Sequence, residues 1–314
     1  MAVNSSIRTD LALEAHELAC AASGGKSPDG VEYREETDGC VKLMYVKVTN
    51  ENGEKSTGKK IGEYVTADIG RLWKDETETF KQKVQYISKT ISKMISGAGG
   101  GKCVLVAGLG NRSITADAIG PRSIDSLLVT RHIKNTTPLI FEKLGLCDVA
   151  AITPGVLGQT GIESADILKS LSDKIKPDML IAIDALASRR LSRLATTVQF
   201  GTDGISPGSG IGNNRQTISS ETLGIPVISI GVPTVVDAAT LAADAIEAVA
   251  AKSGVAPEYD YEKIKEVLCE GDLNFFVTPK ETDIVLKSVS ELIGYSINLA
   301  LNPNLNYEEM LSLV

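Results

Sequence analysis

Apolar and polar residues alternate with a period of two between Val31 and Thr66, for example in Val41-Lys-Leu-Met-Tyr-Val-Lys-Val48. This alternation predicts a β-hairpin or small meander, interrupted at Glu51-Asn-Gly-Glu54. Strong helix formers fill residues 11–22 ahead of it, and an amphipathic pattern over 75–95 behind it predicts a second helix. The first third of the chain is therefore expected to be helix, meander and helix.

Beyond a glycine-rich break at 97–101, apolar runs alternate with helical patterns. Strands that alternate with helices of this length predict an α/β fold, with a mostly parallel sheet and helices on both faces. Residues 11–100 are then an N-terminal helix, hairpin and helix appended to an α/β catalytic core of 101–314. The expected strands are 103–107, 149–153, 179–184, 196–200 and 226–231. The expected helices are 117–132, 162–175, 235–252, 261–269 and 280–301.

Composition narrows the class of protein. The net charge of −8 and a sequence pI near 5.0 disfavour direct nucleic-acid binding. Five cysteines, an odd number without a Cys-x-x-Cys pair, are expected to be reduced thiols in a cytoplasmic compartment. The first ten residues contain no apolar signal segment, and no apolar run is expected to span a bilayer. The sequence therefore predicts a cytoplasmic protein with no nucleic-acid or membrane partner.

Two aspartates end or follow buried-type strands. Asp117 lies beyond Val104–Gly108, and Asp184 directly follows Leu180-Ile-Ala-Ile183. Ligands of open α/β sheets bind at the carboxyl ends of the strands, so we expect the two carboxyl groups to face each other across one cleft. Such a pair shares a proton, and one member can act as general base on water while the other acts as acid. The structural alternative is that Asp117 caps a helix and Asp184 caps the turn after its strand.

Three glycine-rich turns allow a second function. Gly108-Leu-Gly110 follows a strand, but Ser113 stands where a dinucleotide fingerprint has its third glycine. The loop Gly208–Asn213 is either a nest of N–H groups for an anion or a surface loop. Pro154–Gly161 is either a plain connection or a loop facing substrate. A nucleotide- or anion-binding α/β module that uses the first two turns is therefore the alternative function, and a purely structural protein is a third.

Other catalytic classes have less support. The chain contains no Gly-x-Ser-x-Gly elbow of the α/β-hydrolase type. His16 and His132, its two histidines, lie outside metal-ligand spacing, and His132 is expected to follow the last turn of a helix. Cys103 and Cys147 are expected in the core at strand starts. The sequence thus predicts neither a bound metal nor a cofactor.

The chain resembles the germination protease (spore protease) family of spore-forming Firmicutes nearly from end to end. The stretches that carry the resemblance are Arg8-Thr-Asp-Leu-Ala-Leu-Glu14, Gly108-Leu-Gly-Asn-Arg-Ser-Ile-Thr-Ala-Asp-Ala-Ile-Gly-Pro121, Pro154-Gly-Val-Leu-Gly-Gln-Thr-Gly-Ile-Glu163, Ile181-Ala-Ile-Asp-Ala-Leu-Ala-Ser-Arg189, Gly204-Ile-Ser-Pro-Gly-Ser-Gly-Ile-Gly-Asn213, Glu221-Thr-Leu-Gly-Ile-Pro-Val-Ile-Ser-Ile-Gly-Val-Pro-Thr-Val-Val-Asp237 and Val277-Thr-Pro-Lys-Glu281.

The resemblance implies a fold similar to that of the hydrogenase maturation proteases and an endopeptidase that degrades small acid-soluble spore proteins during germination. It implies a homotetrameric zymogen of the forespore or spore core that removes its own propeptide, residues 1–10, by cutting between Asp10 and Leu11. The family's catalytic aspartates map onto Asp117 and Asp184. The related maturation proteases hold a metal with acidic residues and a histidine, but neither histidine here falls in an equivalent loop at the sheet edge. The matching stretches also supply candidates for active-site and substrate loops, namely Asn111, Gly155, Gly158, Glu163, Gly208, Gly210 and Asn213.

The segment that ends at Asp10 is compatible with cleavage on physical grounds. It is polar and lies ahead of a helix, so it can be drawn extended into a cleft, as a protease requires of its substrate. Thr9 or Asp10 is also the expected N-cap of that helix.

Overall fold

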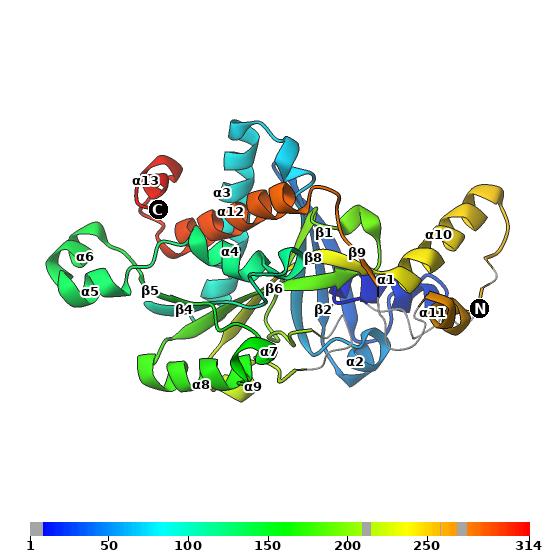
Figure 1. The fold of residues 1–314 in the computed structure, drawn as a ribbon, viewed down its shortest axis with the longest axis horizontal. Helices are drawn as coiled ribbons and strands as arrows, with labels where there is room; N and C mark the ends of the chain where they lie inside the picture. The colour runs from blue at the N-terminus through cyan, green and yellow to red at the C-terminus, as the bar shows by residue number, and fades with distance from the viewer. Residues whose placement is uncertain (1–8, 209–214, 258, 269–274) are drawn as a thin grey trace.

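The computed structural model describes residues 9–208, 215–257, 259–268 and 275–314. Within them, one nine-stranded sheet has the order β1-β2-β3-β7-β8-β6-β4-β5, with β9 paired to β8 (Figure 1). The strands are β1 (Val31–Asp38), β2 (Val41–Val48), β3 (Gly62–Asp68), β4 (Cys103–Gly108), β5 (Asp148–Ile152), β6 (Met179–Ser188), β7 (Thr197–Gly201), β8 (Val227–Asp237) and β9 (Phe276–Val277).

The centre of the sheet is parallel. β4 pairs with β5 and β6, and β6 pairs with β8, all in parallel. Helices connect these strands along the chain, as the α/β prediction requires, and the fold class is confirmed. β7 pairs antiparallel with both β8 and β3, so the meander β1-β2-β3 continues the same sheet. The boundary predicted at residue 100 therefore divides the chain, but the strands on both sides of it belong to one sheet.

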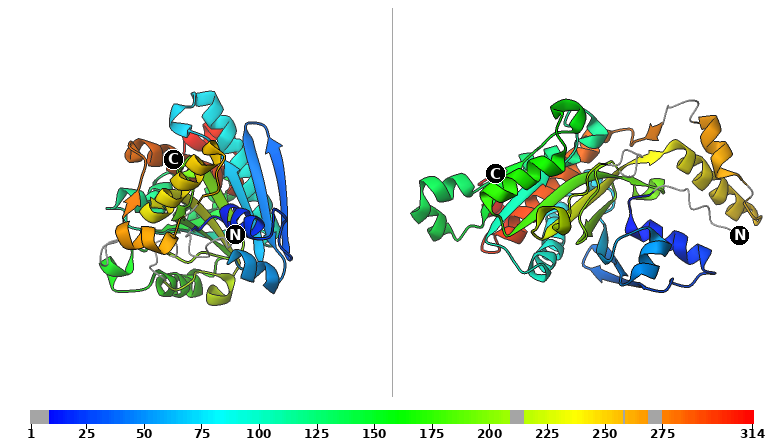
Figure 2. Two further views of the ribbon diagram at one scale, coloured as in Figure 1. Left: turned by 90° about the vertical axis from the view of Figure 1, so that its right-hand side faces the viewer. Right: turned by 90° about the horizontal axis from the view of Figure 1, so that it is seen from below.

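Helices cover both faces of the sheet (Figure 1). α3, α4 and α12 lie on one face, α8 and α9 lie on the other, and α10 and α11 project beyond one end of the sheet (Figure 2). The helices are α1 (Ala12–Ala22), α2 (Glu51–Thr57), η1 (Leu72–Lys74), α3 (Thr77–Gly97), η2 (Thr115–Asp117), α4 (Ile119–Asp125), α5 (Arg131–Thr136), α6 (Pro138–Leu144), α7 (Leu157–Thr160), α8 (Ser164–Ile175), η3 (Leu191–Arg193), α9 (Ser220–Leu223), α10 (Ala238–Ser253), α11 (Tyr261–Leu268), α12 (Thr282–Leu301) and α13 (Tyr307–Leu311).

Alternation along β6 divides its side chains between two cores. Ile181 and Ile183 join the core beneath α3 and α12. Leu180 and Ala182 join the core beneath α8 and α9. Alternate residues of a strand share a face, so the side chain of Asp184 points to the α8 side of the sheet. A one-residue slip would exchange the two sets between the cores and would turn the carboxyl group of Asp184 into the apolar core beneath α3 and α12, so the register of β6 is fixed.

The interruption of the meander expected at Glu51–Glu54 is present, and it is a helix, α2, between β2 and β3. The side chain of Asn50 accepts the N–H of Gly53 at 3.0 Å and caps the helix. Gly58 ends it in the left-handed region, with φ +68°.

The single helix expected over 117–132 is wrong. η2 and α4 cover only its first part, and the chain then leaves the helix for the sheet edge. The side chain of Asn298 on α12 accepts the N–H of Leu128 at 2.8 Å, and the N–H of Thr130 donates to the carbonyl of Val149 at 3.1 Å. His132 consequently lies in the first turn of α5, not after the last turn of a helix.

Two strands are longer than expected. β6 and β8 stay paired past the predicted ends, as far as Ser188 and Val236, with one register shift after Leu186. Asp184 therefore lies within a strand, and the helix expected from residue 235 begins only at Ala238, capped by the side chain of Asp237.

Two smaller expectations at the chain ends also differ from the structure. Neither Thr9 nor Asp10 is the N-cap of α1, whose cap position is Leu11 without a side-chain hydrogen bond. Among the described residues, α12 alone has the length and apolar composition of a membrane span, but it is mostly buried within the protein, as the core helix of a globular fold would be. The expectation of no membrane partner stays a prediction.

Candidate active site

Asp184 lies where β4 has just ended. Gly108, the last residue of β4, pairs with Ile183, and on the other side Asp184 pairs with Gly231 of β8. The Asp184 side chain is only 4% exposed, and its Oδ1 accepts the N–H of Ala185 at 2.9 Å. On the β4 side, the carboxyl group is therefore one residue beyond the carboxyl end of the neighbouring strand.

Asp117 is brought to the same place by close packing of glycines. A Cβ atom on Gly120 would lie 2.5 Å from the carbonyl oxygen of Ile183, so α4 approaches β6 at backbone contact. Gly110 has φ +106°, and a Cβ there would lie 2.1 Å from the carbonyl oxygen of Asp117. The N–H of Asn111 donates to Oδ2 of Asp117 at 2.7 Å. The side chain of Asp117 therefore binds the turn at Asn111 and does not cap a helix, which was the structural alternative for this residue.

The two carboxyl groups differ in their affinity for protons. Burial raises the pKa of Asp184 well above its ordinary value, and the charges of Asp117 and Asp10 raise it further. Burial also raises the pKa of Asp117, but the N–H of Asn111 opposes that effect. Asp184 is therefore the member of the pair that keeps the proton, and Asp117 is the member that ionises first.

The raised pKa of Asp184 makes a prediction about stability. The folded chain holds this proton at pH values where the unfolded chain has released it, so the free energy of unfolding falls as pH rises from about 4 to the folded pKa. Asparagine does not titrate, so the Asp184→Asn variant does not lose stability in this way. The difference in the free energy of unfolding between the variant and the native chain should grow in favour of the variant over that pH range, by at most about 1.4 kcal/mol per pH unit. Urea unfolding between pH 4 and 8 measures it.

The sequence predicts self-cleavage at Asp10–Leu11, so that comparison is made in an Asp117→Asn background, which is expected to leave the chain uncut. Burial, the largest cause of the raised pKa, is unchanged there. An Asp184→Asn substitution with no pH-dependent gain would contradict the assignment of the proton to Asp184.

The N-terminal segment lies against the same strand. The N–H of Asp10 donates to the carbonyl of Ala187 at 2.9 Å, and the N–H of Ala187 donates to Oδ2 of Asp10 at 2.8 Å. Leu11, completely buried, enters the core beneath α8. The predicted cleavage point between Asp10 and Leu11 is thus held beside β6, close enough for the charge of Asp10 to act on Asp184.

A row of paired residues crosses the sheet beneath this segment. Gln199 on β7 pairs with Gly231 on β8, which in turn pairs with Asp184 on β6. The side chain of Leu186 fills the space above Gly231, since a Cβ atom on this glycine would lie 2.3 Å from it. A cavity of about 710 Å³ is lined by residues that include Asp10, Gln199 and Gly231, but neither Asp117 nor Asp184 lines it.

Two side chains that sequence reasoning missed contact the segment. Lys59 donates to the carbonyl of Asp10 at 2.8 Å, and the side-chain amide of Gln199 donates to it at 3.2 Å. Lys59 stands between Gly58 and a second lysine in a polar stretch, and Gln199 occupies a solvent-type position of a short strand. The sequence around Lys59 and around Gln199 therefore contains no feature that would have identified either residue as functional.

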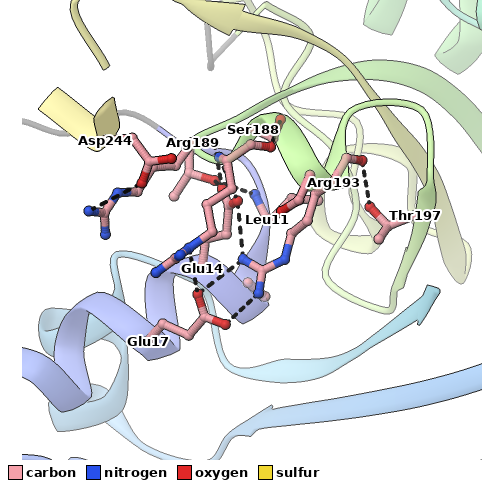
Figure 3. A network of polar contacts seen from close by, with 12 residues as sticks. Leu11, Glu14, Glu17, Ser188, Arg189, Arg193, Thr197 and Asp244 are labelled. Atoms are coloured by element: carbon pink, nitrogen blue, oxygen red, sulfur yellow. Dashed lines mark hydrogen bonds and ion pairs between the residues drawn. The ribbon is translucent and has the colours of Figure 1, made fainter. Parts of the chain in front are cut away.

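The first residues of α1 are anchored by a buried carboxylate (Figure 3). Glu14 has no exposed surface and accepts the backbone N–H groups of Arg189 at 2.6 Å and Arg190 at 3.0 Å. The guanidinium of Arg193 lies 3.1 Å from Glu14 and also binds the half-exposed Glu17. Helix α1 is therefore fixed to the end of β6 only four residues after Asp10.

The predicted substrate loops are only partly assembled around the pair. The side chain of Asn111 accepts an N–H from Gln159 at 2.8 Å, which ties α7 to the Asp117 turn. Gly155 accepts the hydroxyl of Ser164 at 3.1 Å, whereas Gly158 is exposed with open space around it. The remaining candidates make no described contact with either aspartate: Glu163 lies 3.9 Å from Arg215, Gly208 is partly exposed, and Gly210 and Asn213 lie outside the described residues.

The turn glycines suit packing better than phosphate binding. A Cβ on Gly108 would lie 2.3 Å from the carbonyl of Gly120, and Gly110 is filled by the backbone of Asp117. Backbone thus occupies the space that a pyrophosphate needs, and a carboxylate stands beside it. These contacts disfavour the nucleotide-binding alternative.

The described residues contain no group of three or more His, Cys, Asp and Glu side chains placed to hold a metal. His16 stacks on Tyr33 and contacts Cys20 at 3.2 Å, away from the aspartates. Cys103 begins β4 and Cys147 directly precedes β5, as expected, but both are only partly buried and not fully in the core. The pair Asp117 and Asp184 does not fit the metal site of acidic residues and a histidine that the fold resemblance implies.

The absence of a metal requirement is a prediction that chelation can check. We expect peptide hydrolysis to continue at an unchanged rate after dialysis against EDTA and 1,10-phenanthroline, because two carboxyl groups can activate water without a metal. Metal content is measured in the same sample. Stoichiometric metal, with activity lost on chelation and regained on re-addition, would contradict the prediction.

Comparison with known proteins gives a consistent match. A family model described as germination protease matches residues 12–258. The germination protease of Caldanaerobacter subterraneus subsp. tengcongensis is 44% identical over 319 residues and covers 97% of both chains. That of Clostridium tetani is 43% identical and covers 97% of this chain and 98% of its own. That of Geobacillus sp. (strain WCH70) is 37% identical and covers 96% of this chain and 95% of its own.

Among solved structures, a NiFe hydrogenase maturation protease from Thermococcus kodakarensis KOD1 is similar. It has 15% sequence identity and a TM-score of 0.35, and it covers 66% of this chain and 98% of its own.

Proposed function

The chain belongs to the germination protease family, and we propose that it is a self-processing endopeptidase that degrades small acid-soluble spore proteins through the aspartate pair. Membership in the family makes it a protease of spore germination. One observation supports the finer proposal most strongly: the Asp10–Leu11 peptide, which resembles the family's processing sequence, lies against β6 at Ala187, three residues beyond Asp184, where the charge of Asp10 raises the pKa of Asp184.

The proposed reaction follows from the two pKa directions. Ionised Asp117 removes a proton from water, whose oxygen attacks the peptide carbonyl carbon. Protonated Asp184 gives its proton to the leaving nitrogen as the C–N bond breaks. One water is consumed, and a carboxyl and an amino terminus are produced. Proton exchange with solvent restores the starting protonation of the pair.

The proposal extends to regulation and assembly. Residues 1–10 are the propeptide, Asp10–Leu11 is the bond cut, and the enzyme acts as a homotetramer in the forespore or spore core. The docked position of Asp10 supports the choice of bond, because one main-chain hydrogen bond and one hydrogen bond to its carboxylate hold Asp10 against a strand, and proteases bind their substrates extended along a strand. The tetramer and the location rest on the family resemblance.

Two measurements test the proposed function. The purified chain is incubated at mildly acidic and at neutral pH, and its new N-terminus is read by mass spectrometry, with the Asp184→Asn variant as control. The processed chain is then mixed with a small acid-soluble spore protein, and fragments are followed by gel and mass. An intact spore protein, or equal processing in the Asp184→Asn variant, would contradict the proposal.

A further inference from the structure

The carbonyl oxygen of Asp10 has two hydrogen-bond donors supplied by distant parts of the chain. Nζ of Lys59 lies 2.8 Å from it, and Nε2 of Gln199 lies 3.2 Å from it. Lys59 follows α2, and Gln199 is in β7, 140 positions later in the sequence numbering. This oxygen belongs to the peptide bond that the proposed self-cleavage would break. Two donors therefore converge on the one oxygen that would become negatively charged during that reaction.

Both donors are held in place by the fold. Gly58, with φ +68°, ends α2 in the left-handed region and turns the chain so that Lys59 reaches across to the N-terminal segment. Oε1 of Gln199 accepts the N–H of Ala12 at 2.6 Å, which orients the amide group so that its N–H₂ faces Asp10. The donors are thus oriented before any charge develops, which is the condition under which such groups accelerate acyl transfer.

Acidic groups surround the ammonium of Lys59. Burial lowers the pKa of Lys59, while the charges of Asp10, Asp203 and Glu14 oppose that effect. Oδ2 of Asp203 accepts the hydroxyl of Tyr64 at 2.8 Å, and its buried Oδ1 has no hydrogen-bond partner within the described part of the chain. Asp203 and Lys59 line the same cavity. A carboxylate next to the cavity thus compensates the positive charge without occupying the donor side that faces Asp10.

We propose that Lys59 and Gln199 are catalytic residues of self-cleavage that stabilise the negative charge on the Asp10 carbonyl oxygen; this inference rests on the proposed function. When water adds to the carbonyl carbon, the π electrons of the C=O bond move to the oxygen, and the proton of the water goes to Asp117. The charge on oxygen is then bound by the ammonium and the amide. When the C–N bond breaks, the C=O bond reforms, and the nitrogen of Leu11 receives a proton from Asp184.

The experiment compares rates of self-cleavage in purified full-length chains. Lys59→Met removes the cation and keeps a long, unbranched side chain. Lys60→Met is the matched control, because the side chain of Lys60 is exposed at the adjacent position. Gln199→Glu keeps an acceptor for the N–H of Ala12 but removes the donor to Asp10. We expect Lys59→Met and Gln199→Glu each to lower the rate by about 10²- to 10³-fold, and Lys60→Met to change it less than threefold.

A second measurement separates catalysis from docking. In an Asp184→Asn background, which leaves the chain uncut, hydrogen exchange at the Asp10 amide reports whether that N–H is still bound to Ala187. We expect Lys59→Met to leave this exchange rate within threefold of the background. Faster exchange that matches the loss of cleavage would mean that Lys59 only docks the segment, and would overturn the inference.

The possible failures are distinguishable. Folded Lys59→Met and Gln199→Glu chains that cut themselves at the rate of the control, while Asp184→Asn does not, would overturn this inference and leave the proposed function in place. A native chain that never cuts between Asp10 and Leu11 would overturn both.

Discussion

Asp184→Asn is expected to lower the rate of peptide hydrolysis by about 10³- to 10⁴-fold, and Asp117→Asn by a similar factor. An amide is close in size to a carboxyl group but can neither release nor accept the proton that the reaction moves. The double variant should be no slower than the slower single variant by more than a few-fold, because groups that act as one unit fail together. Initial rates on a small acid-soluble spore protein measure all three.

The control for these variants is Asp166→Asn, on the exposed face of α8 and on the same side of the sheet. It should retain full activity, and circular dichroism should show the native helix content in every variant. A folded Asp184→Asn protein with near-native turnover would exclude the aspartate pair as the source of catalysis.

Glu14→Ala is expected to lower the free energy of unfolding by about 3–5 kcal/mol, the largest stability change among the variants considered. The substitution leaves the buried N–H of Arg189 and the partly buried N–H of Arg190 without an acceptor, and it leaves Arg193 without its buried partner. Helix α1 should then detach from the end of β6, and self-cleavage should slow because Asp10 is no longer held. Chemical denaturation in an Asp184→Asn background measures the stability of the uncut chain.

Glu17→Ala is the matched control, one turn further along the same helix. The side chain of Glu17 is 35% exposed and binds Arg193 from the solvent side. Ion pairs of that kind contribute about 0–1 kcal/mol, so its removal should have a small effect. Similar losses for the two variants would show that the buried network of Figure 3 does not hold the helix.

The sequence was sufficient to find Asp184 but not to describe its surroundings. An aspartate directly after four buried-type residues is conspicuous in any chain, and the direction of its side chain follows from alternation along β6. Its place within a longer strand depends on the partner β8, because Val235 and its neighbours can be read as helix until their pairing with β6 is known. Strand ends are set by tertiary pairing, and a single sequence does not contain that information.

The same limit explains why the burial of Glu14 and the contact of Lys59 with Asp10 could not be predicted from the sequence. Glu14 and Glu17 are both acidic residues of one predicted helix. Only the packing of this helix against the end of β6 buries the first and leaves the second partly exposed. Lys59 is one of many lysines until the fold places it against Asp10. The turn at Asp117 was easier to find, because the contacts of Gly108 and Gly110 with Gly120 and Asp117 all lie within one continuous stretch of the chain.

The order of strands in the sheet also sets when the protease can first act. β3 pairs with β7, so residues 62–68 can join the sheet only after residues 197–201 have been made. The row of paired residues that includes Asp184 is complete only when Gly231 is also present. Contacts between such remote segments form late, because the entropy of closing a long loop must be overcome first. A chain still emerging from the ribosome therefore lacks both the strand that receives Asp10 and the glycine beneath it. We therefore expect that the newly made protein does not cut itself during synthesis, and that truncation anywhere before β8 gives a chain that keeps its first ten residues.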